Sequence, residues 1–291
     1  MSAKFCSAGR SMNDIKPSVG VYEKAMPSQL QIREKLELAA RAGYDYLELS
    51  IDESAEKLAR LELADAELTA WKRSAEDTGM PILSMCLSGQ RKYPMGSRDP
   101  QIRAESMRIL RRAVEISALL GIRIIQLAGY DVYYEQGGED TRARFLDNLD
   151  RSVSFAASYG VTLAFETMET DFMNTVGKAL SVVRKINSPY LQIYPDIGNV
   201  TNGAADPVSD LREGRGHIAA AHLKETLPGI FRDLQFGEGH VDFDACIAEL
   251  KSQKVGLYVT ELWYDGKSDP LAYLTVSYTH LRAHETELHL V

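Results

Sequence analysis

The amino-acid sequence predicts an α/β protein in which eight parallel β-strands, each followed by a helix, close into one (β/α)₈ barrel. First, short β-prone apolar runs alternate with helical segments eight times, and this alternation indicates parallel strands joined by helical crossovers. Second, eight such units in about 250 residues are typical of a closed barrel. Third, no G-x-G-x-x-G motif follows the first strand, which disfavours an open doubly wound sheet.

Each predicted strand is a short run of aliphatic, β-branched or aromatic residues. In chain order the runs lie at 18–22, 46–50, 81–86, 122–127, 161–165, 190–194, 218–221 and 257–260. The predicted helices lie between them, at 28–42, 55–79, 100–120, 141–159, 174–187, 205–213 and 242–253. Four helices end at a glycine directly before the next strand, namely Gly43, Gly79, Gly121 and Gly160. The helix-to-strand turns are therefore short, and the longer loops that follow the strands carry the unusual residues.

The eighth unit departs from the pattern. A last helix should begin near Pro270, but residues 275–291 make a poor helical stripe and hold His280, His284 and His289, half of the six histidines. This run resembles translated vector or sequencing-adapter sequence in place of a native C-terminus. We therefore predict a non-native tail and an altered last helix, and we give these histidines no metal-binding role. The remaining divisions are an N-terminal arm over 1–17 and a single barrel domain over 18–274.

Composition narrows the classes of function. The formal net charge of −8 argues against non-specific nucleic-acid binding, although one local basic pocket could still hold a phosphorylated metabolite. The sequence shows no secretory signal and no apolar run near the roughly 18 residues of a membrane span. The three cysteines, Cys6, Cys86 and Cys246, form no C-x-x-C pair, which fits a reducing compartment. We expect a cytoplasmic protein with no membrane or nucleic-acid partner; the oligomeric state stays open, a homodimer included.

Four potential metal ligands stand at the ends of the last four predicted strands. They are Glu166, Asp196, His222 and Glu261. All strand C-termini of a barrel open on the face that carries the active site, so these side chains should converge. Three carboxylates and one imidazole suit one divalent ion, Mn²⁺, Mg²⁺, Co²⁺ or Zn²⁺. Each residue alone could be a solvated strand end or a helix cap, but the shared position of all four favours a metal centre.

Several cations and glycines should lie on the same face and bind a substrate. Lys224 follows His222 by two residues and should point into the barrel mouth. Arg91 and Arg232 lie in loops above it, where a guanidinium could hold a phosphate, although each could equally be an ordinary surface charge. Gly237 and Gly239 could free backbone N–H groups for an anion.

Three further polar residues complete the predicted substrate contacts. Asn174 and Asn199 follow ligand-bearing strands and could bond sugar hydroxyls, although Asn199 could equally cap the next helix. Glu23 follows the first strand and should lie at the barrel mouth.

Seven loop motifs carry a resemblance to a known family. They are MCLSG at 85–89, QLAGYDVYYE at 126–135, FETM at 165–168, FMN at 172–174, YPDIGN at 194–199, HLKET at 222–226 and FGEG at 236–239. In these motifs the chain resembles the L-ribulose-5-phosphate 3-epimerases, also called L-xylulose-5-phosphate 3-epimerases, which are xylose-isomerase-like TIM barrels that act in the breakdown of L-ascorbate and related pentoses. The resemblance runs from about Val19 to Leu274. It implies that the four strand-end residues are the family's metal ligands and that Glu166 and Glu261 are its acid/base pair.

The hypothesis is therefore metal-assisted epimerisation at C3 of a ketopentose 5-phosphate. A divalent ion would neutralise the enediolate, and one glutamate would remove the C3 proton while the other returns a proton on the opposite face. Lys224, Arg232 and the glycine loop would anchor the phosphate.

Three alternatives remain from the residues alone. An aldose–ketose isomerase uses the same enediolate chemistry. A metal-dependent endonuclease would need more metal-binding histidines and a basic DNA track. A non-catalytic sugar-phosphate binding protein would bind the ligand without turnover.

Overall fold

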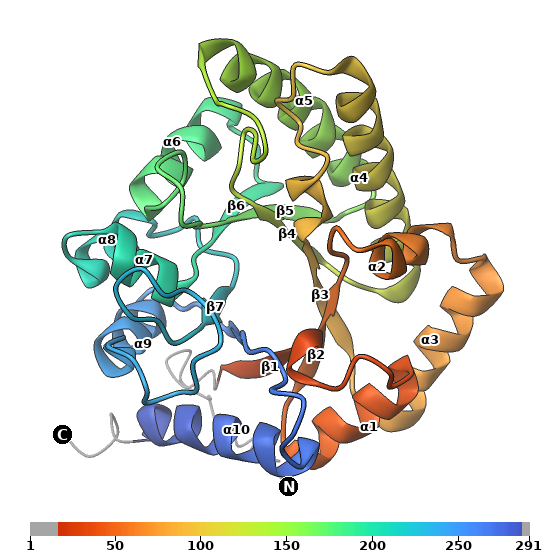
Figure 1. The fold of residues 1–291 in the computed structure, drawn as a ribbon, viewed down its shortest axis with the longest axis vertical. Coiled ribbons are helices and arrows are strands. Elements are labelled where there is room, and N and C mark those ends of the chain that lie inside the picture. Colours follow the sequence, from red (N-terminus) through yellow and green to blue (C-terminus); the bar gives the residue numbers. More distant parts are fainter. Residues whose placement is uncertain (1–16, 287–291) are drawn as a thin grey trace, which may run out of the picture.

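Eight parallel strands form one sheet, and the computed structural model, which describes residues 17–286, shows this sheet curved into a barrel (Figure 1). Hydrogen bonds link the strands in the order β6, β5, β4, β3, β2, β1, β8, β7. Two isolated parallel bridges then join the outer strands, one between Ile193 and Ile218 and one between Asp196 and His222. The predicted (β/α)₈ fold is confirmed.

The elements follow the predicted order. The strands are β1 Ser18–Tyr22, β2 Tyr46–Ser50, β3 Ile82–Leu87, β4 Ile124–Ala128, β5 Thr162–Glu166, β6 Leu191–Tyr194, β7 Ala221–Leu223 and β8 Leu257–Thr260. The α-helices are α1 Ile32–Ala42, α2 Ala55–Ala59, α3 Asp65–Thr78, α4 Pro100–Leu120, α5 Glu139–Ser158, α6 Val176–Ile186, α7 Ile197–Gly203, α8 Pro207–Glu213, α9 Phe243–Ser252 and α10 Pro270–Thr286. Short 3₁₀ turns are η1 Glu23–Ala25, η2 Arg60–Glu62 and η3 Ser88–Arg91. No helix in this part of the chain is long and apolar enough to span a membrane.

Two helices differ from the prediction. The single helix expected over 55–79 is divided into α2 and α3, because Leu63 and Ala64 are extended, with ψ of 138° and 156°. A further helix, α7, begins directly after Asp196, which acts as its N-cap. The sequence signal for α7 is short, since seven residues with two glycines show little helical periodicity.

Local sequence sets the ends of the long helices. Asp99 caps α4 by accepting a hydrogen bond from the Gln101 N–H at 2.7 Å, and Pro100 occupies the first turn, where its missing N–H costs nothing. Gly121 ends the helix in the left-handed conformation, with φ of +86°. These caps set the two ends of α4, so the segment between β3 and α4 is a loop.

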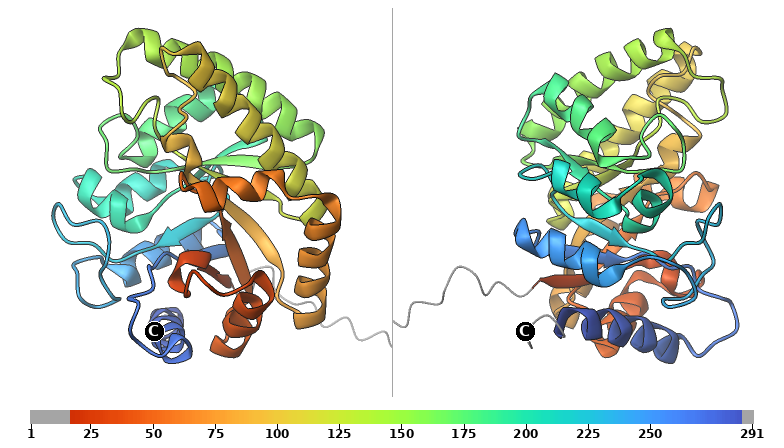
Figure 2. Two further views of the ribbon diagram at one scale, coloured as in Figure 1. Left: turned by 45° about the vertical axis from the view of Figure 1, so that its right-hand side comes forward. Right: turned by 90° about the vertical axis from the view of Figure 1, so that its left-hand side faces the viewer.

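The core has two layers. One lies between the sheet and the surrounding helices, and the other fills the barrel interior with side chains that include Tyr46, Tyr194 and Val259. Gly20 is required inside the barrel, because a Cβ at this position would overlap the ring of Tyr46. The interior is therefore a packed floor, and side chains at the strand C-termini stand above it. Figure 2 shows the long loops after β7 and β8 on this side of the molecule.

Helix α10 closes the ring of helices beside α1 and α9 (Figure 1). It buries Leu274 and Leu281, and the ring of Tyr278 packs edge-on against Tyr44 with centroids 5.1 Å apart. The poor helical stripe of this segment therefore does not prevent a helix over its described part, which packs against the barrel through these contacts. That residues 275–291 are a non-native tail stays a prediction. Residues 287–291 of this tail lie outside the described residues, and so do residues 1–16 of the predicted arm over 1–17.

Candidate metal centre

Glu166, Asp196, His222 and Glu261 meet at the mouth of the barrel. All four are buried, and one ligand atom from each lies within 4.8 Å of the others. Glu166 ends β5, Asp196 lies two residues beyond β6, His222 is the middle residue of β7, and Glu261 directly follows β8. The convergence predicted from the strand ends is what the fold produces, because neighbouring parallel strands bring their carboxyl ends to one edge.

Backbone hydrogen bonds fix where these side chains start. The His222 N–H donates to the Pro195 carbonyl at 2.9 Å, and the Glu261 N–H donates to the Leu223 carbonyl at 2.9 Å. The two carboxylate oxygens of Asp196 have different partners. Its Oδ1 accepts from the Asn199 N–H at 2.9 Å and so caps α7, whereas its Oδ2 points into the cluster. The cap therefore orients the oxygen that is available as a ligand.

His222 is oriented by Glu48, a fully buried carboxylate on β2. The His222 Nε2 lies 2.6 Å from Glu48 Oε1, and Glu48 Oε2 accepts hydrogen bonds from Ser84 at 2.7 Å and Tyr194 at 2.9 Å. An imidazole that donates from Nε2 presents Nδ1 to the other side, where Glu166 Oε1 lies 3.0 Å away. Metal-bound histidines commonly donate their second N–H to a carboxylate in this way.

Lys224 lies inside the cluster. Its Nζ is 2.7 Å from Asp196 Oδ2 and 3.1 Å from Glu261 Oε2, and its side chain is 7% exposed. Lys224 thus lies at the barrel mouth, as predicted, with its ammonium held by two of the candidate metal ligands, and its contact with a phosphate stays a prediction.

The pKa values reflect this crowding. Burial raises the pKa of Glu166, and the neighbouring Glu261 raises it further. Burial also raises the pKa of Asp196 to about 8, although Lys224 opposes the effect. Burial alone would raise the pKa of Glu261, but Lys224 and His222 outweigh it and lower that pKa to about 2. Burial lowers the pKa of His222, yet Glu48, Glu261 and Glu166 together raise it well above its ordinary value.

The donor set fits a divalent ion. Asp196 Oδ2 and Glu261 Oε2 are buried and accept no hydrogen bond, although the Lys224 ammonium lies within ion-pair distance of both. Buried carboxylate oxygens without hydrogen bonds are costly unless positive charge compensates them. Glu166 and the Nδ1 of His222 complete a compact set of oxygen and nitrogen donors, which Mn²⁺, Mg²⁺, Co²⁺ or Zn²⁺ could accept.

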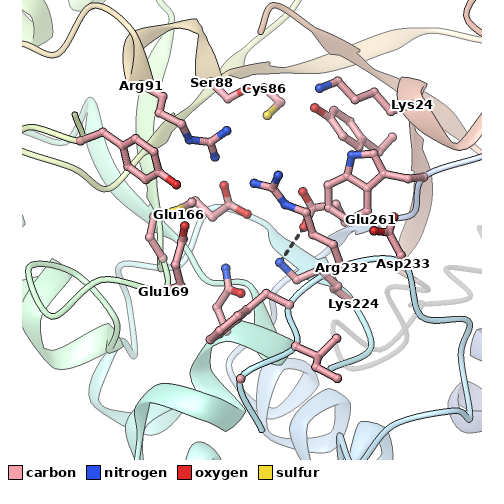
Figure 3. A pocket seen from close by; sticks show the side chains of 18 residues that line it. Lys24, Cys86, Ser88, Arg91, Glu166, Glu169, Lys224, Arg232, Asp233 and Glu261 are labelled. Atoms are coloured by element: carbon pink, nitrogen blue, oxygen red, sulfur yellow. Dashed lines mark ion pairs between the residues drawn. The ribbon is translucent and has the colours of Figure 1, made fainter. Parts of the chain in front are cut away.

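A cavity of about 450 Å³ lies above the cluster and is lined by Glu166, Lys224 and Glu261 at its floor. Figure 3 shows the guanidinium groups of Arg91 and Arg232 pointing into this cavity from two different loops. Its volume falls within the range of small-ligand pockets, about 300–1,000 Å³.

Aromatic rings hold both arginines in place. The Arg91 guanidinium lies 5.6 Å from the ring centroid of Tyr130 and 5.1 Å from that of Tyr133, and the Arg232 guanidinium lies 5.4 Å from Trp263. The Arg91 Nε is buried and has no hydrogen-bond partner. The ion pairs found among the described residues include neither arginine, which leaves both charges available to an anion.

The two predicted asparagines differ in whether they line the cavity. Asn199 lines the cavity, and its Nδ2 donates to the Thr167 carbonyl at 2.7 Å. Asn174 does not line the cavity, and its Oδ1 accepts from Lys178 at 2.8 Å. Asn174 is thus not brought to the site in this arrangement.

Gly237 and Gly239 also lie away from the cavity lining. The Gly237 N–H donates to Glu225 Oε2 at 3.0 Å, and a Cβ at Gly239 would overlap the Glu225 carboxylate. The prediction that these glycines free N–H groups for an anion is therefore corrected for Gly237, because Glu225 already serves as the anion. Both glycines shape the loop that carries Arg232.

Glu23 is placed away from the cluster as well. It is fully buried, and its carboxylate pairs with Lys35 at 2.7 Å, Lys57 at 2.7 Å and Arg60 at 2.6 Å. Burial alone would raise the pKa of Glu23, but these three cations hold it well below its ordinary value. The predicted substrate contact is corrected: η1 turns this side chain toward α1 and α2, where it joins β1 to both helices.

Replacing Glu23 by glutamine is expected to lower the free energy of unfolding by about 3–5 kcal/mol, because two buried lysines and the partly buried Arg60 then lose their shared counter-charge. Chemical denaturation of the variant beside wild type measures this. Glu37→Gln, which removes an exposed carboxylate on α1, is the control and should change stability by less than about 0.5 kcal/mol. A Glu23 variant as stable as that control would contradict the assignment.

Sequence reasoning gave no role to two residues that support the cluster. Glu48 orients His222, and the Gln126 side-chain amide donates to Glu166 Oε2. Both are polar residues at the middle of buried five-residue strands. A polar residue within a buried strand could have indicated a supporting role in the sequence, but it does not indicate which candidate ligand that residue contacts.

Comparison with known proteins adds three findings. The family model described as xylose isomerase-like TIM barrel matches residues 36–284. The L-ribulose-5-phosphate 3-epimerase UlaE of Salmonella paratyphi C (strain RKS4594) is 44% identical over 255 residues, which cover 87% of this chain and 90% of that protein. The protein of the same name from Escherichia coli O157:H7 is also 44% identical over the same shares.

Solved structures share the fold at low sequence identity. A structure of L-ribulose 3-epimerase has a TM-score of 0.77 at 18% identity and covers 94% of this chain and 97% of that chain. The apo form of 3-keto-D-glucoside 4-epimerase YcjR from E. coli has a TM-score of 0.76 at 20% identity and covers 92% of this chain and 100% of that one.

Proposed function

Because this chain belongs to the xylose isomerase-like TIM barrel family and, within it, to the L-ribulose-5-phosphate 3-epimerases, we propose that it interconverts L-ribulose 5-phosphate and L-xylulose 5-phosphate by inverting C3. Family membership makes it an isomerase and confirms the resemblance found in the sequence. We further propose a cytoplasmic role in the catabolism of pentoses such as those derived from L-ascorbate.

The observation that carries this proposal is the pair of glutamates at the cavity floor. Glu166 and Glu261 come from β5 and from the end of β8, and His222 Nδ1 lies between them at 3.0 Å and 3.7 Å from their oxygens. Inversion needs one group to remove a proton from C3 and a second to return a proton to the opposite face. Two buried carboxylates on different strands, facing one cavity, meet that requirement.

The residues around this pair supply the rest of the chemistry. Glu166, Asp196, His222 and Glu261 would hold one divalent ion, Zn²⁺, Mn²⁺, Mg²⁺ or Co²⁺, which supplies Lewis-acid stabilisation of the enediolate charge. The other parts of the cavity hold and orient the sugar phosphate, with Asn199 positioned for a hydroxyl.

Arg91 and Arg232 bind the phosphate in this proposal, since both cations face the cavity without an ion-pair partner among the described residues. Replacing Arg91 by alanine is expected to raise KM for L-ribulose 5-phosphate about 10- to 100-fold, as the loss of a charged hydrogen bond implies. The kcat should change little, because this contact is made equally in the ground and transition states.

Steady-state kinetics on L-ribulose 5-phosphate and on unphosphorylated L-ribulose measure this effect. Arg111→Ala is a matched control, because Arg111 also stacks on an aromatic ring, that of Phe155 at 5.4 Å, but lies on α4 away from the cavity lining. An equal rise in KM for both sugars in the Arg91 variant would show that Arg91 does not recognise the phosphate.

Isotope exchange tests the reaction itself. The metal-loaded protein is incubated with L-ribulose 5-phosphate in D₂O, and NMR follows each carbon. We expect deuterium at C3 together with formation of L-xylulose 5-phosphate. Exchange at C1 would instead indicate an aldose–ketose isomerase, which uses the same enediolate chemistry. Binding of the sugar phosphate without exchange at any carbon would indicate a non-catalytic binding protein and overturn both enzymatic readings.

A further inference from the structure

We propose that Lys224 is a catalytic residue whose ammonium donates a hydrogen bond to the substrate oxygen that becomes negative when the C3 proton leaves. This inference deepens the proposed epimerisation and rests on it. It gives Lys224 a different task from Arg91 and Arg232, which face the phosphate.

The position of the ammonium carries the inference. Lys224 Nζ lies 3.1 Å from Glu261 Oε2 and 2.7 Å from Asp196 Oδ2, and Lys224 also lines the cavity. Figure 3 shows Lys224 beside Glu261 and joined to it by an ion pair, whereas Arg91 projects from the η3 loop. A base must approach the proton it removes to about 2.6–3.2 Å. A group in contact with that base therefore also lies close to the oxygens on C2 and C3.

The donor capacity of the ammonium is not exhausted by its protein partners. A lysine ammonium has three N–H donors, and its two carboxylate neighbours, which lie within ion-pair distance, can engage at most two of them. The third is left for a molecule in the cavity. The phosphate on C5 is separated from the reacting C3 by C4, so the same lysine is a poor candidate for holding the phosphate.

Inversion at C3 moves one proton to a glutamate and returns another from the second glutamate. The C3 proton moves to one glutamate carboxylate, and the C3–H electron pair forms the C2–C3 double bond. The carbonyl electron pair moves onto O2, which becomes the negative oxygen of the enediolate. Lys224 keeps its proton and donates a hydrogen bond to that oxygen. The O2 electron pair then re-forms the C2 carbonyl, and the electron pair of the C2–C3 double bond takes a proton on the opposite face of C3 from the second glutamate, which enters the step as the carboxylic acid.

The magnitude of the effect follows from where the charge develops. Removing one preorganised donor to a developing oxyanion lowers kcat by about 10²–10³-fold. Lys224→Met keeps the length and apolar stem of the side chain but removes the charge and all donors. We expect it to lower kcat by about this factor on L-ribulose 5-phosphate and on L-ribulose alike, with the preference for the phosphorylated sugar unchanged.

The binding of Mn²⁺, followed by electron paramagnetic resonance, separates catalysis from support of the metal ligands. We expect the Kd of Lys224→Met for Mn²⁺ to be equal to or lower than that of wild type, because a cation that competes for Asp196 and Glu261 is gone. Methylamine added to Lys224→Ala should restore part of the lost kcat, an effect that a purely structural role would not produce. Lys178→Met, an ion-paired lysine outside the cavity lining, is the control and should keep wild-type kinetics.

Three outcomes would overturn the inference. A loss confined to the phosphorylated sugar would make Lys224 a phosphate anchor. A loss explained by weaker Mn²⁺ binding would make it a support for the metal ligands. An unchanged kcat would give it no role in the reaction. If wild type itself shows no deuterium exchange at C3, the proposed function fails, whereas active wild type with an equally active Lys224→Met contradicts this inference alone.

Discussion

Replacing either Glu166 or Glu261 by glutamine is expected to lower kcat for epimerisation by about 10²–10⁴-fold, the usual contribution of a positioned acid or base. Glutamine keeps the size of the side chain and a carbonyl oxygen that can still approach a metal ion, but it cannot accept the C3 proton. Both carboxylates are buried at the cavity floor, so bulk water cannot readily replace the missing base.

The pattern of isotope exchange distinguishes two bases from one. Each variant retains one glutamate, which can still remove the C3 proton of one epimer and return a deuteron to the same face. Glu166→Gln should therefore exchange the C3 hydrogen of only one of the two epimers in D₂O, and Glu261→Gln should exchange that of the other. NMR of each epimer incubated separately with each variant measures this, with Glu37→Gln on α1 as the control that keeps both activities.

Two results would contradict the two-base assignment. If one variant lost exchange for both epimers while the other kept exchange for both, one glutamate would act as the base on both faces. If either variant kept epimerising at the wild-type rate, that glutamate would only support the fold or bind the ion.

The convergence of the four candidate ligands could be predicted from sequence because their position depends on local information. Glu166, Asp196, His222 and Glu261 each end or follow a recognisable apolar run, and a barrel brings all strand ends to one face. This prediction does not require knowing which side chains are neighbours in the folded protein. The same rule placed Glu23 at the mouth and was wrong about its role, because its partners are set by tertiary contacts with helices and turns elsewhere in the chain.

Contacts between loop residues are a second feature of the site that the sequence pattern does not predict. The Gly237 N–H was expected to meet an anion from solution, and the structure supplies that anion internally as Glu225, twelve residues earlier in the chain. Likewise, spacing put Lys224 in the barrel mouth but did not show that two carboxylates hold it there. Which cation pairs with which acid depends on distances of a few ångströms between loops, and hydrophobic periodicity carries no such information.

Replacing Asp196 by asparagine is expected to weaken binding of a divalent ion by more than about 100-fold, because loss of even an outer-shell partner of a ligand costs about 10–100-fold. Asparagine caps helices about as well as aspartate does, so the hydrogen bond from the Asn199 N–H to Oδ1 should survive in the variant. The substitution therefore removes the charge that faces the cluster and keeps α7 in place.

Thermal unfolding with and without Mn²⁺ measures the effect. At a Mn²⁺ concentration 100 times the wild-type Kd, wild type should gain about 2.7 kcal/mol of stability, and the variant should gain less than about 0.5 kcal/mol. Activity of the variant should fall to that of wild type treated with a chelator. Asp206→Asn, which changes the equivalent cap of α8 far from the ligands, should keep the full Mn²⁺-dependent gain.

Stability without metal decides whether Asp196 is a ligand or only a structural residue. Three carboxylates lie within one compact buried cluster, where like charges repel and burial disfavours ionisation. If Asp196 is retained to bind a cation, removing its charge should leave the metal-free protein at least as stable as wild type, while the gain from Mn²⁺ disappears. A variant that is destabilised without metal and yet binds Mn²⁺ with wild-type affinity would instead show that the Asp196 charge serves only its ion pair with Lys224.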